Sequence, residues 1–421
     1  MKVSRDELAS MLRLALPVVI AELGWVSMSI VDTMMVGRLG AEAIGAVSIG
    51  SSLFIAAAIF GIGLLLGLDT FISQAFGADN QPECRRWLAH GVYLSLFLTP
   101  PLTGAAMLPT LFMESWGTRP EVLVLAVPYL KTLALSVLPL LLYATFRRYL
   151  QALSKVGFVM LTLITANVVN AVANWVLIFG NLGFPALGVE GAGWATFISR
   201  AYMAVTLFAF ILYTERHRLE AFIHEFTHLE KHRLKDLIGL GFPAAIQLTL
   251  EIGVFATATA FASRLAPVSL AAHQVALATA AFTFMVPLGV SAAGAVRVGQ
   301  AMGRGEPKQA ADSGWTALVV GTAFMAFAAL MFLIFPVQIL RLYTPEATVI
   351  SVGVPLLAIA AFFQVFDGLQ VISTGILRGT GETRTAMKAS LVCHWFLGLP
   401  IGYVLCFVLD WGVFGLWIGL S

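Results

Sequence analysis

The chain has 421 residues, of which 59% are hydrophobic and only 11% are charged, against roughly 25% charged residues in soluble domains. Its formal net charge of +2 is too small to indicate a nucleic-acid surface, and its three cysteines form neither a metal-type spacing nor an obvious disulfide set. The composition therefore excludes an ordinary soluble domain and predicts a protein embedded in a lipid bilayer.

Runs of about 20 apolar residues recur along the whole chain, which is typical of transmembrane helices. The sequence predicts eleven full spans and the start of a twelfth, at residues 14–36, 46–73, 88–111, 122–144, 156–179, 193–212, 238–260, 270–294, 312–335, 349–373, 386–408, and from 412 onward. The first run follows basic residues, but it is too long for a signal peptide and no small-residue cleavage site follows it. We therefore expect it to be retained as the first helix.

Lysine and arginine residues concentrate on alternate connections between these spans. The side that includes the N-terminus and residues 213–236 holds 19 of them, whereas the other side holds four. This bias places the N-terminus in the cytoplasm and predicts a multi-pass membrane protein. Residues 213–236 become a cytoplasmic linker; its histidines at 217, 224, 228 and 232 could bind a metal, but its mixed charges favour a solvated amphipathic helix.

The chain repeats itself at a constant spacing. GRLGAEAIGAVSIG from Gly37 aligns with SRLAPVSLAAHQVA from Ser263, and the same offset aligns Pro17 with Pro243. Six spans per half is an even number, so the two halves form a parallel repeat. The expected fold is an all-α membrane protein of twelve transmembrane helices in two parallel-repeat bundles of six, residues 1–212 and 237–421. Because the chain stops four residues after Trp417, we expect the last helix to be largely missing from it.

Polar residues inside the first bundle fall on two helical stripes. Glu22, Trp25, Ser29 and Asp32 share one face of the first helix, and Asn167, Asn170 and Asn174 share one face of the fifth. Facing one another, these stripes would form a pocket of one carboxylate and several amide oxygens, which suits a proton or a sodium ion. The alternative is that the asparagines only hold helices together. We expect Asp32, Asn170 and Asn174 to form a coupling-cation site.

The second bundle carries a different set of polar residues. Gln247 and Glu251 share a face of the seventh helix, and Gln364, Asp367 and Gln370 lie on one side of the tenth. Intramembrane acids are functional candidates because they must face a cavity or a partner. We expect Glu251 and Asp367 to bind the coupling cation, with sodium as one possibility, or a cationic substrate. Glu251, Asp367, Gln247 and Gln364 are the expected substrate-binding residues.

No enzyme signature accompanies these residues. The sequence contains no G-x-x-x-x-G-K-[ST] phosphate loop, no HExxH motif and no recognisable Ser-His-Asp arrangement. We therefore expect neither catalysis nor a cofactor, and the work of transport would come from an ion gradient.

The ordered motifs resemble the multidrug and toxic compound extrusion (MATE) family, most closely its bacterial NorM type. They are Pro17 with VDTMMVGRLG, RRYLQAL, GVEGAGWAT, GLGFPAAIQ, LAAHQVA, VGQAMGRGEP and GILRGTGETR. The resemblance covers the whole chain apart from the missing end, and the order and spacing of the motifs are more specific than any one of them.

The resemblance implies export of amphipathic, mostly cationic drugs in exchange for protons or sodium, by a protein we expect to be a monomer. The family's helix 1 acid corresponds to Asp32, its helix 5 polar positions to Asn170 and Asn174, and its helix 7 and helix 10 acids to Glu251 and Asp367. Some members of the family have an aspartate at the position of Asn174. Some have a tyrosine at the position of Phe363, and because phenylalanine has no hydroxyl group, this chain lacks that tyrosine ligand.

Two other functions remain open from the sequence. A lipid-linked saccharide flippase of the same superfamily would need several basic residues along its cleft, whereas only Lys131 and Arg200 fall within spans. A channel or receptor fits less well with a two-fold internal repeat and acids in both halves.

Overall fold

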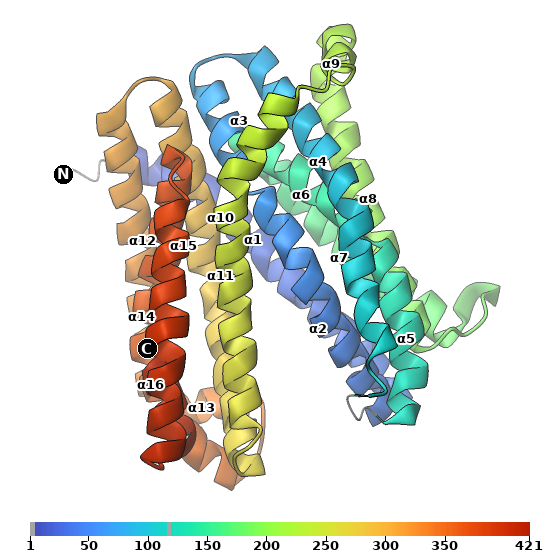
Figure 1. Ribbon diagram of the computed structural model, residues 1–421, viewed down its shortest axis with the longest axis vertical. Coiled ribbons are helices and arrows are strands. Elements are labelled where there is room, and N and C mark those ends of the chain that lie inside the picture. The colour runs from blue at the N-terminus through green and yellow to red at the C-terminus, as the bar shows by residue number, and fades with distance from the viewer. Residues whose placement is uncertain (1–4, 116–118) are drawn as a thin grey trace. The chain divides into compact units, whose positions relative to one another are not determined.

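The computed structural model describes residues 5–115 and 119–421 as a chain of helices (Figure 1). The helices of the first half are α1 (Arg5–Val36), α2 (Ala41–Leu64), α3 (Gly67–Gly77), α4 (Gln81–Met107), α5 (Pro120–Leu135), α6 (Val137–Ala152), α7 (Val156–Phe179), α8 (Val189–Glu215) and α9 (Leu219–Glu225). Those of the second half are α10 (Lys231–Ala262), α11 (Pro267–Gly303), α12 (Pro307–Ile334), α13 (Pro336–Arg341), α14 (Ala347–Thr380), α15 (Arg384–Ser390), α16 (Leu399–Tyr403) and α17 (Gly412–Leu420). Residues 1–4 of the expected cytoplasmic N-terminus lie outside the described part.

The predicted membrane spans are confirmed, with local breaks that the sequence pattern did not indicate. Ten helices of the described chain are long and apolar enough to cross a membrane, and α5 with α6 makes an eleventh span bent by 43°. The bend falls at Ser136, whose hydroxyl donates a hydrogen bond to the Leu133 carbonyl oxygen at 2.5 Å. Two π-helical stretches, Leu391–Gly398 and Val404–Val408, interrupt the eleventh predicted helix, and α17 stands at the position of the twelfth.

The chain forms two compact units, and two helices pass from one unit to the other. The N-terminal unit contains Ile20–Ala245 and the short turn Gly303–Gly305, whereas the C-terminal unit contains Ile246–Met302, Glu306–Ser421 and the part of α1 up to Val19. Helix α1 therefore changes unit just after Pro17, and α10 changes unit just after Pro243. Proline weakens a helix at this point because it lacks an N–H donor and clashes with the preceding turn. The two changes fall at equivalent positions of the internal repeat.

Close helix packing in the N-terminal unit depends on small residues, as is usual in membranes. Helix α2 packs on α5, and α8 packs on α5, α6 and α7. A Cβ atom at Gly50 would lie 2.6 Å from the Tyr129 ring, so only glycine lets α5 approach α2 this closely. The Tyr129 hydroxyl then lies 2.9 Å from the Ser51 Oγ, which fixes the side chain on the interior side of both helices.

The C-terminal unit is built around the contact of α12 with α14. A Cβ atom at Gly368 would lie 2.6 Å from Met325 of α12, so this glycine permits the contact beside Asp367. On α10, the Leu250 carbonyl oxygen accepts a hydrogen bond from the Trp395 indole at 3.1 Å. His273 is buried between two partners: its Nδ1 accepts from Trp417 at 3.1 Å and its Nε2 lies 3.0 Å from the Thr259 hydroxyl. These contacts make His273 a packing residue.

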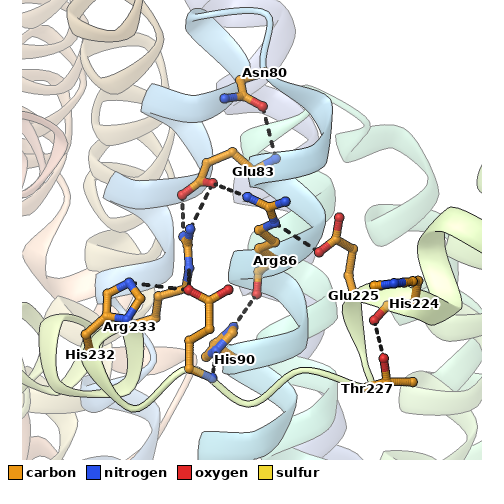
Figure 2. A network of polar contacts seen from close by, with 10 residues as sticks. Asn80, Glu83, Arg86, His90, His224, Glu225, Thr227, His232 and Arg233 are labelled. Atoms are coloured by element: carbon orange, nitrogen blue, oxygen red, sulfur yellow. Dashed lines mark hydrogen bonds and ion pairs between the residues drawn. The ribbon is translucent and has the colours of Figure 1, made fainter.

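The linker between the two halves is anchored to α4 through charged contacts, which Figure 2 shows. Arg233 pairs with both carboxylate oxygens of Glu83, and its Nε contacts Glu230 at 2.9 Å. Arg86 of α4 contacts Glu225 of α9 at 3.0 Å. The hydrogen bond from Arg233 lowers the pKa of the Glu230 carboxyl. These pairs hold the linker on the N-terminal unit through α4.

The same segment is mostly exposed and helical, as the sequence predicts, but its helix is broken at residues 226–230. Its helix α9 has only seven residues, and Phe222 in it is buried. The Nε2 atom of His90 accepts a hydrogen bond from the Glu230 backbone N–H at 3.0 Å (Figure 2). The Arg233 guanidinium lies 5.1 Å from the centre of the Trp87 ring. Within residues 5–115 and 119–421, no three His, Cys, Asp or Glu side chains are arranged to hold a metal ion.

Candidate functional site

The structure brings Asp32, Asn170 and Asn174 together inside the N-terminal unit. Asp32 lies near the C-terminal end of α1, and the two asparagines lie one turn apart on α7, both fully buried. The Asn174 amide nitrogen donates to Asp32 Oδ1 at 2.5 Å and to Asn170 Oδ1 at 3.1 Å. The second oxygen of Asp32 accepts a hydrogen bond from the Thr196 hydroxyl of α8 at 3.4 Å. The Asp32 carboxylate is thus held by an amide and a hydroxyl.

A cavity of about 270 Å³ opens beside this carboxylate. Trp25 and Asp32 of α1, Phe54 of α2, Tyr129 of α5 and Arg200 of α8 line it. Every lining residue belongs to the N-terminal unit. The cavity therefore combines an apolar, aromatic wall with one carboxylate and one guanidinium, a composition typical of sites for amphipathic ligands.

Two polar residues of the predicted stripes lie elsewhere. The Asn167 amide donates to the Gly24 carbonyl oxygen at 3.0 Å and to the Leu163 carbonyl oxygen at 2.9 Å, so it holds α7 against α1. Glu22 forms a largely buried ion pair with Arg147 of α6. Both contacts stabilise helix packing and contribute nothing to the cavity.

The second cluster lies inside the C-terminal unit. Glu251 Oε1 accepts hydrogen bonds from the Gln247 amide at 3.0 Å and from the Gln370 amide at 2.9 Å. The Gln247 amide also contacts the Thr374 hydroxyl at 3.3 Å. Gln247, one helical turn before Glu251 on α10, and Gln370 of α14 therefore both donate to one oxygen of the Glu251 carboxylate through their amide groups.

The remaining two predicted residues of this unit lie near the cluster without joining its hydrogen bonds. Gln364 is buried and accepts a hydrogen bond from the Thr283 hydroxyl of α11 at 3.0 Å. Asp367 interacts with Glu251 electrostatically, and no side chain in the described part of the chain hydrogen-bonds to its carboxylate. The structure therefore assembles Gln247, Glu251 and Gln370 directly and leaves Asp367 beside them.

Sequence reasoning missed the residues that complete each cluster. Thr196, Tyr129 and Ser51 are ordinary hydroxyl side chains within spans, and no spacing rule distinguishes them from residues that bond their own helix backbone. Thr374 was missed for the same reason. Arg200 carried a detectable signal, since a charged residue inside a span is a functional candidate by default, but the sequence did not show that it shares a cavity with Asp32.

Comparison with known proteins gives one consistent family. The MatE family model matches residues 17–176 and 243–404. The two matched segments begin at Pro17 and Pro243, the pair of prolines that the internal repeat aligns.

Curated relatives match over almost the whole chain. A probable multidrug resistance protein NorM of Mesorhizobium japonicum is 34% identical, with 99% of this chain and 91% of the relative covered. A protein of the same description from Brucella suis is 33% identical, covering 99% and 90%. The multidrug resistance protein NorM of Vibrio vulnificus is 32% identical, covering 99% and 92%.

Solved structures share the fold at lower identity. The eukaryotic MATE transporter AtDTX14 superposes with a TM-score of 0.88 at 20% identity, covering 99% of this chain and 92% of that one. An outward-facing multidrug resistance MATE family transporter gives a TM-score of 0.87 at 20% identity, covering 98% and 92%.

Proposed function

The chain belongs to the MatE family of membrane transporters, and from this premise we propose that it is a multidrug efflux antiporter. It exports amphipathic, mostly cationic compounds by alternating access, in exchange for protons or sodium ions. The observation that carries the proposal is the environment of the Asp32 carboxylate, which lies at the wall of an aromatic cavity. It accepts hydrogen bonds from Asn174 and Thr196, and no basic side chain of the described chain lies at contact distance from it.

Asp32 acts as the coupling group of the N-terminal unit. An ionised carboxylate in an apolar cavity attracts an organic cation, whereas the protonated form does not. Drug and coupling ion therefore exclude one another at Asp32. Antiport follows when the cavity opens to each side of the membrane in turn, because the ion and the drug each favour a different state.

Sodium fits the same residues after one side-chain rotation. At present the Asn174 amide nitrogen points at two oxygen atoms, Asp32 Oδ1 and Asn170 Oδ1. A 180° flip of the Asn174 side-chain amide would put its Oδ1 where its N–H donor now lies. The Oδ1 atoms of Asp32, Asn170 and Asn174 would then face one point. Oxygen ligands of this kind suit a hard cation. Asn174 thus allows the site to take either a proton on Asp32 or a sodium ion between the three residues.

The C-terminal unit supplies a second acidic site. Glu251 is held by Gln247 and Gln370, and Asp367 adds a further negative charge nearby. Two carboxylates with amide neighbours create a negative potential in a medium of low dielectric constant, which attracts a coupling cation or the positive end of a drug. Gln364 and Gln247 provide hydrogen bonds to the same cargo.

Movement of α1 links ion binding to drug release. Pro17 weakens the helix before the segment that carries Trp25 and Asp32. When protonation changes the hydrogen bonds of Asp32, α1 bends near Pro17 and narrows the cavity. The protein works as a monomer in the bacterial inner membrane, with its N-terminus and linker in the cytoplasm, as the 19-to-4 distribution of basic residues supports.

One vesicle experiment tests this function. Purified protein is reconstituted into phosphatidylcholine vesicles, and the uptake of ethidium, a fluorescent cation, is recorded under an imposed proton gradient and separately under a sodium gradient. We expect at least one gradient to drive uptake, and collapse of that gradient to stop it. Uptake that is the same with and without either gradient would refute antiport.

A further inference from the structure

Arg200 is a buried cation in the wall of the cavity that contains Asp32. Its side chain is 7% exposed, and it projects from α8 in the N-terminal unit. One guanidinium nitrogen donates to the Ser136 hydroxyl at 2.5 Å. The guanidinium carbon lies 4.5 Å from the centre of the Phe54 ring and 6.0 Å from that of Trp25. A hydroxyl and two aromatic faces thus hold the group in place.

Three other largely buried arginines of the N-terminal unit have a carboxylate partner. Arg85 contacts Glu215 at 3.1 Å, Arg148 contacts Asp69 at 2.8 Å, and Arg147 pairs with Glu22. Burying a charge costs free energy unless it is paired and hydrogen-bonded. At Arg200, no acidic side chain of residues 5–115 or 119–421 makes such a contact. A guanidinium has five N–H donors in a planar fork, and the bond to Ser136 uses one nitrogen of that fork.

We propose that Arg200 binds a carboxylate of the transported compound, so that this cavity selects amphipathic zwitterions over simple cations. The inference rests on the proposed function, because it assigns the substrate class of the same cavity. The positive group of the substrate lies toward Asp32 and its carboxylate toward Arg200, with Trp25 and Phe54 contacting the apolar part.

The chemistry of the cavity favours this occupant over others. Arginine recognises carboxylates through two parallel hydrogen bonds, which give both energy and geometric selection. A simple anion would meet the negative charge of Asp32, and a simple cation would meet the positive charge of Arg200. The volume of about 270 Å³ is slightly below the roughly 300–1,000 Å³ of typical small-molecule sites. The cavity therefore fits the part of a drug-sized molecule that carries both charged groups.

The test compares one rhodamine dye in two forms, the free acid and its methyl ester, in phosphatidylcholine vesicles under the gradient that drives ethidium uptake. The two forms share the cationic ring system and differ in the carboxylate. We expect the wild type to take up the acid with an apparent KM about tenfold lower than that of the ester, as one charge-assisted contact predicts. Arg200→Gln should abolish this preference, so that the variant takes up the acid and the ester with similar apparent KM values.

Lys131→Gln provides the matched control. It removes a positive charge from a span of the same unit, but Lys131 is exposed and does not line the cavity, so the preference should remain. Arg200→Lys keeps the charge without the planar fork, and it should reduce the preference even if Arg200→Gln fails to reach the membrane. An acid-to-ester ratio unchanged in either Arg200 variant, or equal loss of both dyes, would overturn the assignment. Uptake of ester and ethidium but no acid by the wild type would overturn it too and leave the antiport proposal standing.

Discussion

Replacing Glu22 by glutamine should destabilise the protein without removing its transport site. Glu22 of α1 and Arg147 of α6 form an ion pair whose side chains are 14% and 16% exposed. Removing one partner of a buried pair leaves the other charge uncompensated, which typically costs about 3–5 kcal/mol. Because both side chains keep some exposure to solvent, we expect the loss of unfolding free energy to lie near the lower end of this range. Gradient-driven transport per folded molecule should stay close to that of the wild type.

The measurement is the free energy of unfolding in mixed detergent micelles, followed by tryptophan fluorescence during denaturant titration. Glu42→Gln is the matched control, because Glu42 is an exposed acid at the start of α2. Removing the Glu42 charge should change the free energy of unfolding by less than about 1 kcal/mol, the size of a charge effect at a helix end. The double variant Glu22→Gln with Arg147→Met should recover most of the lost stability, since apolar replacement of a whole buried pair is often neutral.

The opposite pattern would refute this reasoning. If Glu22→Gln unfolds like the wild type, within about 1 kcal/mol, the pair is not a net structural contact of the expected size. If that variant also fails to transport, Glu22 belongs to the functional residues of α1. The outcome decides whether its place on the Asp32 stripe reflects packing or transport.

Four further substitutions test the proposed function and the orientation. Asp32→Asn should fold with a stability change within about 1 kcal/mol and lose gradient-driven efflux from vesicles; wild-type transport under both proton and sodium gradients would rule out coupling at this residue. Glu251→Gln and Asp367→Asn should each greatly weaken drug resistance at normal membrane expression, whereas full resistance in both would make these acids structural. Thr227→Cys, in a background without the native cysteines, should react with an impermeant maleimide only after the cells are permeabilised; labelling of intact cells would reverse the orientation.

The spans were predictable because a bilayer imposes a length and a composition on every crossing helix. The constant offset of the internal repeat likewise predicted the equivalence of Pro17 and Pro243, which the unit boundaries follow. The bend between α5 and α6 was not predictable, because Ser136 stabilises it through local hydrogen bonds that a hydropathy pattern does not contain. The π-helical stretches of the eleventh span were missed for the same reason.

Helical spacing was enough to suggest the Asp32 cluster, because stripes on two helices of one bundle can meet only where both are buried. Spacing could not decide what each polar residue contacts. Asn167 shares a stripe with Asn174, yet it bonds two backbone carbonyl oxygens, whereas Asn174 reaches Asp32. Thr196 joins the cluster from α8. Such partners depend on the rotation of each helix about its axis, which tertiary packing sets.

The nature of the partner separates the intramembrane acids into two groups. Glu22 and Asp69 each contact an arginine, so their charges are compensated by a cation that cannot leave. Asp32 and Glu251 contact amides and, for Asp32, a hydroxyl, and these neutral groups hold the carboxylate without cancelling its charge. Arg200 acts on Asp32 across the cavity without contacting it, so neither acid has a counter-ion in contact and a mobile cation can take that place. In the proposed function a proton, a sodium ion or a cationic drug each fills that role, and their competition for the same carboxylate is the physical basis of exchange.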